Sequence, residues 1–174
     1  MLGGARSGKS AHAEAIALAS GLDLLYIATA EAGDAEMADR IAHHRDRRGP
    51  DWRTVEEPLA LSETLRHEAD PGRAILVDCL TLWLSNLLFA ERDLEAEAAG
   101  LARVLPDLSG RVVFVSNEVG LGLVPETALG RRFRDAQGRL NQAVAAAVPE
   151  VVFVAAGLPL VLKAPRTRTE EPTS

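Results

Sequence analysis

The sequence is poor in cysteine and in lysine. Cys79 is the only cysteine among 174 residues, so no disulfide can form within the chain and a disulfide-rich scaffold is excluded. A single thiol is typical of proteins from a reducing compartment. Only two of the 19 cationic residues are lysines, Lys9 and Lys163, and the others are all arginines. This scarcity raises the question of what each lysine does.

Long apolar runs and an excess of positive charge are also lacking. No stretch reaches the roughly 18 apolar residues of a membrane-spanning helix. Residues 1–4 have neither the charged nor the apolar region of a signal peptide, so we expect a cytoplasmic protein. The net charge of −6 argues against a general nucleic-acid-binding surface. A hydrophobic share of 47% with 25% charged residues is typical of a folded globular chain.

Short apolar runs alternate with helical patterns along the chain. This alternation predicts an α/β fold with a mostly parallel sheet flanked by helices. A turn at 157–159 followed by 160–163 predicts an antiparallel edge strand near the C-terminus. We expect one domain over 1–163 and a disordered tail over 164–174. The strands are predicted at 24–29, 74–78, 112–116 and 151–155, and the helices at 10–20, 35–48, 59–68, 80–91, 94–105 and 127–148.

The first ten residues contain a phosphate-binding motif. The pattern G-x-x-x-x-G-K-[ST] is matched by Gly3, Gly4, Ala5, Arg6, Ser7, Gly8, Lys9 and Ser10. The glycines let backbone N–H groups curl around phosphate oxygens, and the following helix points its positive end at the same anion. The lysine reaches the β- and γ-phosphates, and the Ser10 hydroxyl can hold Mg²⁺. Only Met1 and Leu2 remain to form the preceding strand, so we expect either that this strand is very short or that the given sequence begins a few residues late.

A carboxylate, Asp78, ends the apolar run 75–77. In a phosphate-loop protein, an acidic residue at a strand end is typical of a second metal anchor of the Walker B type. The alternative is that Asp78 caps the helix that begins near Leu80, and the two roles are compatible.

The predicted helix at 35–48 carries two histidines among many arginines. Met37, Ile41 and His44 share one face, so periodicity alone favours a partly buried histidine at position 44. The five arginines at 40, 45, 47, 48 and 53 form either a solvated cationic face or a second polyphosphate site. In the second case the arginines favour attack on phosphorus by a neutral His44, whose pKa they would lower.

Several further motifs occur in one order and together resemble a known family. They are the phosphate loop, Tyr26-Ile27-Ala28-Thr29, Arg40-Ile41-Ala42-His43-His44-Arg45, Trp52-Arg53-Thr54-Val55-Glu56, Ser116-Asn117-Glu118-Val119-Gly120, Val124-Pro125-Glu126, Arg132-Phe133-Arg134-Asp135 and Gly157-Leu158-Pro159. Over about residues 3–163 the chain resembles the bifunctional adenosylcobinamide kinase / adenosylcobinamide-phosphate guanylyltransferase family of cobalamin synthesis.

The resemblance implies two reactions. In the first, a nucleoside triphosphate, ATP or GTP, phosphorylates the aminopropanol hydroxyl of adenosylcobinamide. In the second, GTP guanylylates a histidine, and the GMP passes to adenosylcobinamide phosphate to give adenosylcobinamide-GDP. The family's nucleophile matches His44, the second histidine of the pair. The family also implies a RecA-like phosphate-loop fold, Mg²⁺ and a homotrimer.

The family's nucleotide contacts carry over to matching positions of this sequence. Arg47 stands where the family usually has glycine. Asp78 stands where the family often has glutamate, and the aspartate side chain has the shorter reach. Asn117 and Glu118 are either a strand end and turn or a polar pair at the sheet edge where α/β proteins bind ligands, and neither is assigned a role. Besides the phosphate loop, the implied contacts are Ala28, Thr29, Ala30, Arg45, Asp46, Arg47, Arg48, Glu56 and Asp78, with Ser10 and Asp78 as metal ligands and Lys9 and His44 as catalytic residues.

Two other hypotheses remain open at the level of sequence. A phosphate-loop small-molecule kinase without guanylyltransfer would need Lys9, Ser10 and Asp78 but not His44. A non-catalytic nucleotide-binding switch would bind nucleotide without turning over a small molecule. The switch hypothesis gives no reason for the arginines that surround His44 in the sequence.

Overall fold

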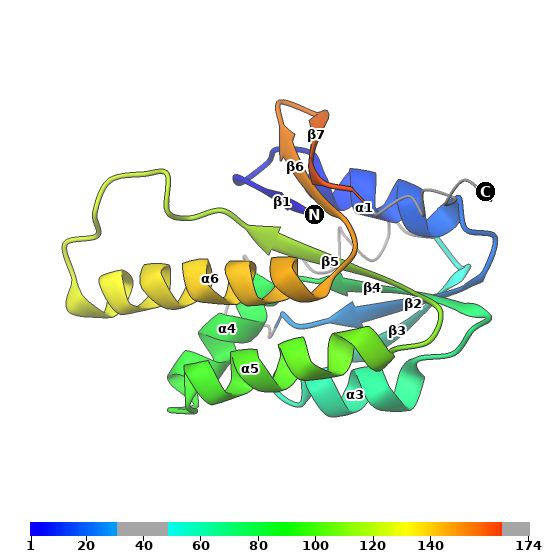
Figure 1. The fold of residues 1–174 in the computed structure, drawn as a ribbon, viewed down its shortest axis with the longest axis horizontal. Helices are drawn as coiled ribbons and strands as arrows, with labels where there is room; N and C mark the ends of the chain where they lie inside the picture. Colours follow the sequence, from blue (N-terminus) through cyan, green and yellow to red (C-terminus); the bar gives the residue numbers. More distant parts are fainter. Residues whose placement is uncertain (31–48, 165–174) are drawn as a thin grey trace, which may run out of the picture.

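A computed structural model describes residues 1–30 and 49–164. They form a seven-stranded sheet of order β3-β2-β4-β5-β1-β6-β7, in which only β7 is antiparallel to its neighbour (Figure 1). The strands are Leu2–Gly3, Asp23–Ala28, Trp52–Glu56, Arg73–Asp78, Arg111–Asn117, Val151–Ala155 and Leu158–Lys163 for β1 to β7. The helices are α1 (Lys9–Leu18), α3 (Leu61–Glu68), α4 (Leu80–Phe89), α5 (Leu94–Val104) and α6 (Ala128–Ala147), and a 3-10 turn at Leu105–Asp107 follows α5.

The predicted α/β fold with a mostly parallel sheet and an antiparallel edge is confirmed. The four predicted strands correspond to β2, β4, β5 and β6, and five predicted helices correspond to α1, α3, α4, α5 and α6 within about two residues at each end. The strand β3 was not among the predicted strands. The predicted helix at 35–48 and nearly all of the predicted tail lie outside the described residues.

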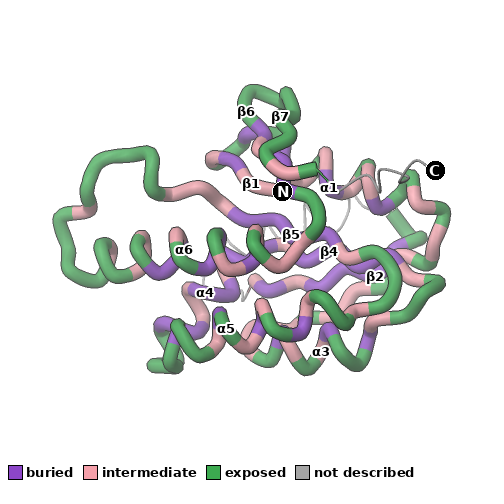
Figure 2. Tube along the Cα trace, viewed as in Figure 1, coloured by how far each residue is buried: buried purple, intermediate pink, exposed green. Residues whose placement is uncertain are grey.

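Two clusters of buried side chains cover the two faces of the sheet. Figure 2 shows that the buried residues gather in the central strands, such as β4 and β5. On one face α1 packs through Ala13 and Ala17 against the sheet residues Leu76 and Val115. On the other face, α3, α4, α5 and α6 enclose a larger core that includes the fully buried Trp83. Because side chains alternate along a strand, the residues of β5 with odd numbers face α1 and those with even numbers face α6.

The first strand is as short as the sequence predicts. β1 has two residues and pairs with β5 and β6 on its two sides. The Met1 amine donates a hydrogen bond of 2.7 Å to the Phe114 carbonyl. Towards the amino ends of β5 and β6, a largely apolar cavity of about 520 Å³ lies beside Met1. Burial lowers the pKa of the Met1 amine from 8.0 to about 6, and Glu150 partly opposes this shift.

This buried amine predicts that stability depends on pH for protein with a free amine at Met1. The folded-state pKa is lower than the unfolded one, so the unfolded chain binds more protons between pH 6 and 8, and stability rises across that window. A difference of about two pKa units corresponds to roughly 2–3 kcal/mol. Urea unfolding from pH 5.5 to 8.5 measures it. Nα-acetylated protein is the control, because it lacks only the titrating amine. An equal rise in its free energy of unfolding between pH 6 and 8 would contradict the prediction.

The second of the two lysines has a structural role. The Lys163 ammonium donates hydrogen bonds to the carbonyls of Ala145, Ala146 and Val148, at 2.8, 3.1 and 2.5 Å. These carbonyls lie at the C-terminal end of α6, where helix carbonyls lack partners within the helix and a cation is favoured. Lys163 therefore fastens the last strand to the end of the longest described helix.

None of the helices in the described ranges has the length and apolar character needed to cross a bilayer.

Candidate nucleotide-binding site

The parallel strands bring most of the predicted site residues to one edge of the sheet. Gly3 of β1 pairs with Asn117 of β5, and Ala28 of β2 pairs with both Glu56 of β3 and Asp78 of β4. All five residues lie at the carboxyl ends of their strands. Ligands of open α/β sheets bind at this edge, so the topology alone makes it the candidate site.

The phosphate loop, residues 3–10, connects this edge to α1 and depends on two glycines. A Cβ on Gly3 would lie 2.4 Å from the Val154 carbonyl oxygen and 2.6 Å from the Ser7 hydroxyl oxygen, so no side chain fits there. Gly8 has a φ of 95°, in the left-handed region that side chains disfavour, and it precedes the first helical residue, Lys9. These two positions explain why the motif requires glycine where the sequence has it.

The loop offers donors to an anion. Within the described part of the chain, no hydrogen bond is formed by the backbone N–H groups of residues 4–8. Such groups at the positive end of a helix bind phosphate oxygens. The side chain of Lys9 is only 8% exposed, and its ammonium donates to the Gly4 carbonyl at 3.1 Å. The loop therefore has the donors and the charge that a nucleoside polyphosphate needs.

Asp78 and Lys9 act on the same small region. Burial raises the pKa of the Cys79 thiol to about 11; the Asp78 carboxylate also raises it, and the Lys9 ammonium opposes the shift. Both charges are thus close enough to influence one buried thiol. Asp78 is not the N-cap residue of α4, because Cys79 stands between it and the first helical residue, Leu80.

The residues near the loop suit a hard cation. Mg²⁺ takes oxygen ligands and is commonly bound through one or two protein oxygens together with substrate phosphates. Ser10 lies in the first turn of α1, and the side chain of Asp78 faces α1 because Leu76, two residues earlier, packs there. No cluster of three or more metal-binding side chains occurs in the described ranges, so phosphate oxygens would have to complete the coordination.

The side chain of Thr29 connects the ends of β2 and β4 at this edge of the sheet. Its hydroxyl donates to the Cys79 carbonyl at 2.7 Å and accepts from the Cys79 N–H at 2.9 Å. The carbonyl of Thr29 accepts from the Asn86 amide of α4 at 2.7 Å. Thr29 has no exposed surface, so its side chain holds the β2 and β4 ends together. Ala28 and Ala30 flank it at the same edge.

Glu56 is exposed at the far end of the edge. Four strand spacings separate β3 from β1 in the sheet order, which at about 4.8 Å each is roughly 19 Å. A contact between Glu56 and the phosphates held by residues 3–10 would therefore be long. The position suits the nucleoside or a second substrate better than the polyphosphate.

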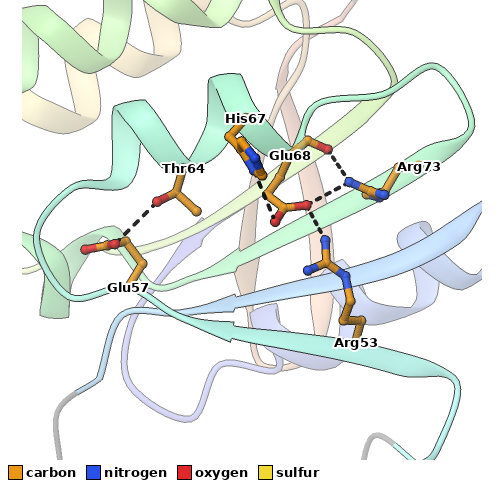
Figure 3. A network of polar contacts seen from close by, with 6 residues as sticks. All are labelled: Arg53, Glu57, Thr64, His67, Glu68 and Arg73. Carbon is orange, nitrogen blue, oxygen red and sulfur yellow. Dashed lines mark hydrogen bonds and ion pairs between the residues drawn. The ribbon is translucent and has the colours of Figure 1, made fainter.

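The sequence left open that Arg53 belongs to a second polyphosphate site. In the structure its partner is a carboxylate. Arg53 alternates with Trp52 along β3, and Trp52 packs with the α1 face, so Arg53 faces α3. Figure 3 shows its guanidinium paired with the carboxylate of Glu68, which Arg73 also contacts at 2.8 Å. The pleat of β3 therefore directs Arg53 away from the α1 face and towards Glu68, while the arginines at 40, 45, 47 and 48 lie outside the described residues.

The Glu68 cluster predicts a stability effect without an effect on nucleotide binding. The pKa of Glu68 is lowered, chiefly by the hydrogen bond from Arg53. Glu68→Gln removes a mostly buried carboxylate between two guanidiniums, so we expect a loss of about 1–3 kcal/mol at pH 7. The loss should shrink as the pH falls through the lowered pKa of Glu68, because the wild-type carboxylate is then protonated.

Urea unfolding measures this effect, and Glu95→Gln is the matched control. Glu95 pairs with Arg139 at 3.6 Å through largely exposed side chains, so its replacement should cost less than about 1 kcal/mol. Equal losses in the two variants, or weaker nucleotide binding by Glu68→Gln, would contradict the structural role.

The remaining predicted site residues, His44, Arg45, Asp46, Arg47 and Arg48, lie outside the described residues. The sequence marked Asn117 as a polar residue at the end of a buried strand and left it without a role. The structure places this residue at the end of β5, the strand between β1, which leads into the phosphate loop, and β4, which ends at Asp78.

Comparisons with known proteins point to one family. The model of a family described as cobinamide kinase / cobinamide phosphate guanyltransferase matches residues 1–162. The chain is 56% identical over 165 residues to a bifunctional adenosylcobalamin biosynthesis protein of Pseudomonas aeruginosa, covering 94% of this chain and 95% of the relative. The corresponding proteins of Escherichia coli and Salmonella typhimurium are 42% and 44% identical, each covering 92% of this chain and 97% of the relative.

Proposed function

The chain belongs to the cobinamide kinase / cobinamide phosphate guanyltransferase family, and we propose on this premise that it catalyses both transfers. It would phosphorylate adenosylcobinamide with ATP or GTP and then convert the phosphate to adenosylcobinamide-GDP with GTP. The observation that carries the proposal is the phosphate loop at the carboxyl edge of the sheet, with Lys9 at the start of α1 and Asp78 at the end of β4.

The kinase step needs positioning and neutralisation of charge more than covalent chemistry. The loop N–H groups would bind the phosphate oxygens, and Lys9 would turn from the Gly4 carbonyl to the β- and γ-phosphates. The aminopropanol hydroxyl attacks the γ-phosphorus, a new O–P bond forms, and the bond to the β-phosphate oxygen breaks. Mg²⁺, when bound by Ser10, Asp78 and phosphates, supplies further charge neutralisation.

The guanylyl transfer would proceed in two displacements through His44. An imidazole nitrogen attacks the α-phosphorus of GTP, forming an N–P bond while the bond to the leaving pyrophosphate breaks. A phosphate oxygen of adenosylcobinamide phosphate then attacks the same phosphorus, breaks the N–P bond and regenerates the histidine. The nearby arginines at 45, 47 and 48 would neutralise charge on the phosphates and keep the imidazole unprotonated.

A labelling experiment tests this proposal. The protein is incubated with Mg²⁺ and either α-labelled or γ-labelled GTP, and acid-labile, base-stable label on the protein is measured. Retention of α-label without γ-label supports the histidine intermediate. With adenosylcobinamide added, γ-label should pass to the corrinoid. Absence of α-label would leave a kinase without guanylyltransfer, and nucleotide binding without any transfer would favour a switch.

We also propose a homotrimer in a cytoplasmic setting, as the family resemblance implies. Large apolar side chains exposed on the single chain support an assembly that covers them, notably Leu158 at 72% and Leu160 at 60% exposure on the edge strand β7. A single buried cysteine suits a reducing compartment. Light scattering of purified protein tests the assembly, and a monomeric mass at micromolar concentration would contradict it.

A further inference from the structure

At the edge of the sheet away from the phosphate loop, β5 and β6 extend beyond the strand that lies between them. That strand, β1, pairs with both neighbours only through its two residues. In the register of the sheet, Met1 is opposite Val115 of β5 and Val152 of β6. Since β5 begins at Arg111 and β6 at Val151, four residues of β5 and one of β6 extend past Met1.

The cavity of about 520 Å³ beside Met1 lies between these strand ends, and we name it the strand slot. Its lining comes from both faces of the sheet. Ile16 packs with the cluster on the α1 face, whereas Phe114 and Val144 belong to the cluster on the α6 face. Elsewhere a strand separates these two clusters, so a cavity that contacts both lies in the plane of the sheet.

The backbone of Met1 already has the hydrogen bonds of a parallel strand. Its amine donates to the Phe114 carbonyl at 2.7 Å, and its carbonyl accepts from the Ser116 N–H at 2.9 Å. These are two successive bonds of a parallel pair. Alternate residues of a strand direct their backbone groups to the same neighbour, so the Phe114 N–H and the Val112 carbonyl face the strand slot. The slot therefore offers one donor and one acceptor at the next step of the ladder.

The side chains that line the strand slot require an apolar occupant. Arg111 and Glu150 are exposed at its mouth, and Ser116 and Asn141 hydrogen-bond to each other at 2.7 Å. The other lining residues are apolar or glycine. Successive side chains of a strand point to opposite faces, and here both faces are apolar. A strand in this slot must therefore be apolar at every position, as strands buried on both faces are.

Two other occupants suit the strand slot less well. An apolar small molecule would suit a cavity of this volume, but it would leave the Phe114 N–H and the Val112 carbonyl without partners, which is costly for buried backbone groups. The chain that follows Lys163 starts beside Val151. Residues 165–174, however, contain two arginines, two glutamates and two prolines, which a buried apolar strand does not accommodate.

We propose that the strand slot binds an extended apolar segment of about four residues, which is joined to the Met1 nitrogen, lengthens β1 and is encoded directly upstream of Met1. The residue two positions before Met1 would donate to the Val112 carbonyl and accept from the Phe114 N–H. A separate peptide would place a carboxylate beside the buried amine, whereas a peptide bond at this point removes both charges. The slot lies at the edge opposite the nucleotide site, so the proposal is independent of the proposed function.

Thermal unfolding of three forms of the full chain tests the proposal. The first form begins at Met1, the second carries the residues of the four codons directly upstream, and the third carries Gly-Ser-Gly-Ser in the same place, both extensions behind an initiator methionine. We expect the encoded extension to raise the Tm by at least about 5 °C, because its apolar side chains become buried. The Gly-Ser-Gly-Ser extension should change the Tm by less than about 2 °C, since it buries no apolar side chain.

Hydrogen exchange distinguishes a lengthened strand from unspecific stabilisation. The Phe114 amide should exchange at least about tenfold more slowly, relative to the Val113 amide, in the form with the encoded extension. Val113 is the matched control because its backbone groups face β4, where it pairs with Leu76. The rise in stability expected between pH 6 and 8 should also disappear, because the Met1 nitrogen becomes a peptide amide and no longer titrates.

Several results would overturn the proposal. A stop codon or a charged residue among the four upstream codons would exclude the assigned segment, and so would equal Tm values for the two extended forms. An unchanged ratio of the Phe114 and Val113 exchange rates would exclude the lengthened strand. An apolar compound that stays bound to the form beginning at Met1 in native mass spectrometry, and that also binds the form with the encoded extension, would make the cavity a small-molecule site instead.

Discussion

Lys9→Ala should lower the kinase turnover of adenosylcobinamide by at least roughly 10²–10³-fold, the cost of removing one well-placed charged donor from a transition state. The buried position of Lys9 at the start of α1, within reach of the Gly4 carbonyl, fits a residue that exchanges this contact for phosphate oxygens. Transfer of γ-label from the nucleotide to the corrinoid measures the effect. Lys9→Arg should restore little, since a planar guanidinium does not fit a loop built around an ammonium.

The only other lysine of the chain provides the matched control. Lys163→Ala also removes one ammonium, but its partners are carbonyls at the end of α6, so it should lower stability and leave turnover per folded molecule unchanged. Unchanged turnover in Lys9→Ala, or equal losses in both variants, would contradict the assignment of Lys9 to the phosphates.

The features predicted from the sequence are those whose signal lies within one strand, one helix or one loop. The apolar runs of β4, β5 and β6 are buried on both faces, so nearly every residue contributes to the signal. The phosphate-loop motif was equally readable because it lies within residues 3–10 and Gly8 has a left-handed φ, although one contact that excludes a side chain at Gly3 comes from the distant Val154 carbonyl oxygen. Strand β3 gave no such signal: it is an edge strand of mixed residues, anchored by the edge-to-face contact of Trp52 with Tyr26 at 6.2 Å.

Features that depend on tertiary pairing were missed or misjudged. Arg53 seemed to belong with the arginines near His44, but the pleat of β3 turns it to Glu68, a residue in a helix that follows the strand. The relation of Asn117 to Gly3 joins residues 114 positions apart, and only the sheet order reveals it. Asp78 was predicted as a metal anchor, a helix cap or both, and the start of α4 at Leu80, with Cys79 before it, excludes only the cap.

His44→Ala should abolish retention of α-label on the protein and lower guanylyl transfer by about 10⁴-fold or more, because the variant has no group to form the N–P bond. The kinase step should keep its rate, since the phosphate loop and Asp78 are unchanged. The experiment uses α-labelled GTP with Mg²⁺, then adenosylcobinamide phosphate as acceptor, and follows label on the protein and on the corrinoid.

His43→Ala is the matched control for this result, because His43 adjoins His44 in the sequence yet, on a helical wheel, falls on a different side of the predicted helix. It should keep the α-label and most of the transfer activity. If His43→Ala loses the label and His44→Ala keeps it, the neighbouring histidine is the nucleophile. If both keep it, the guanylyl group is carried elsewhere, and the resemblance has placed the intermediate wrongly while the kinase assignment to Lys9 is unaffected. Arginine variants at 45, 47 and 48 should reduce the rate of labelling without moving the label, since they neutralise charge and form no bond to phosphorus.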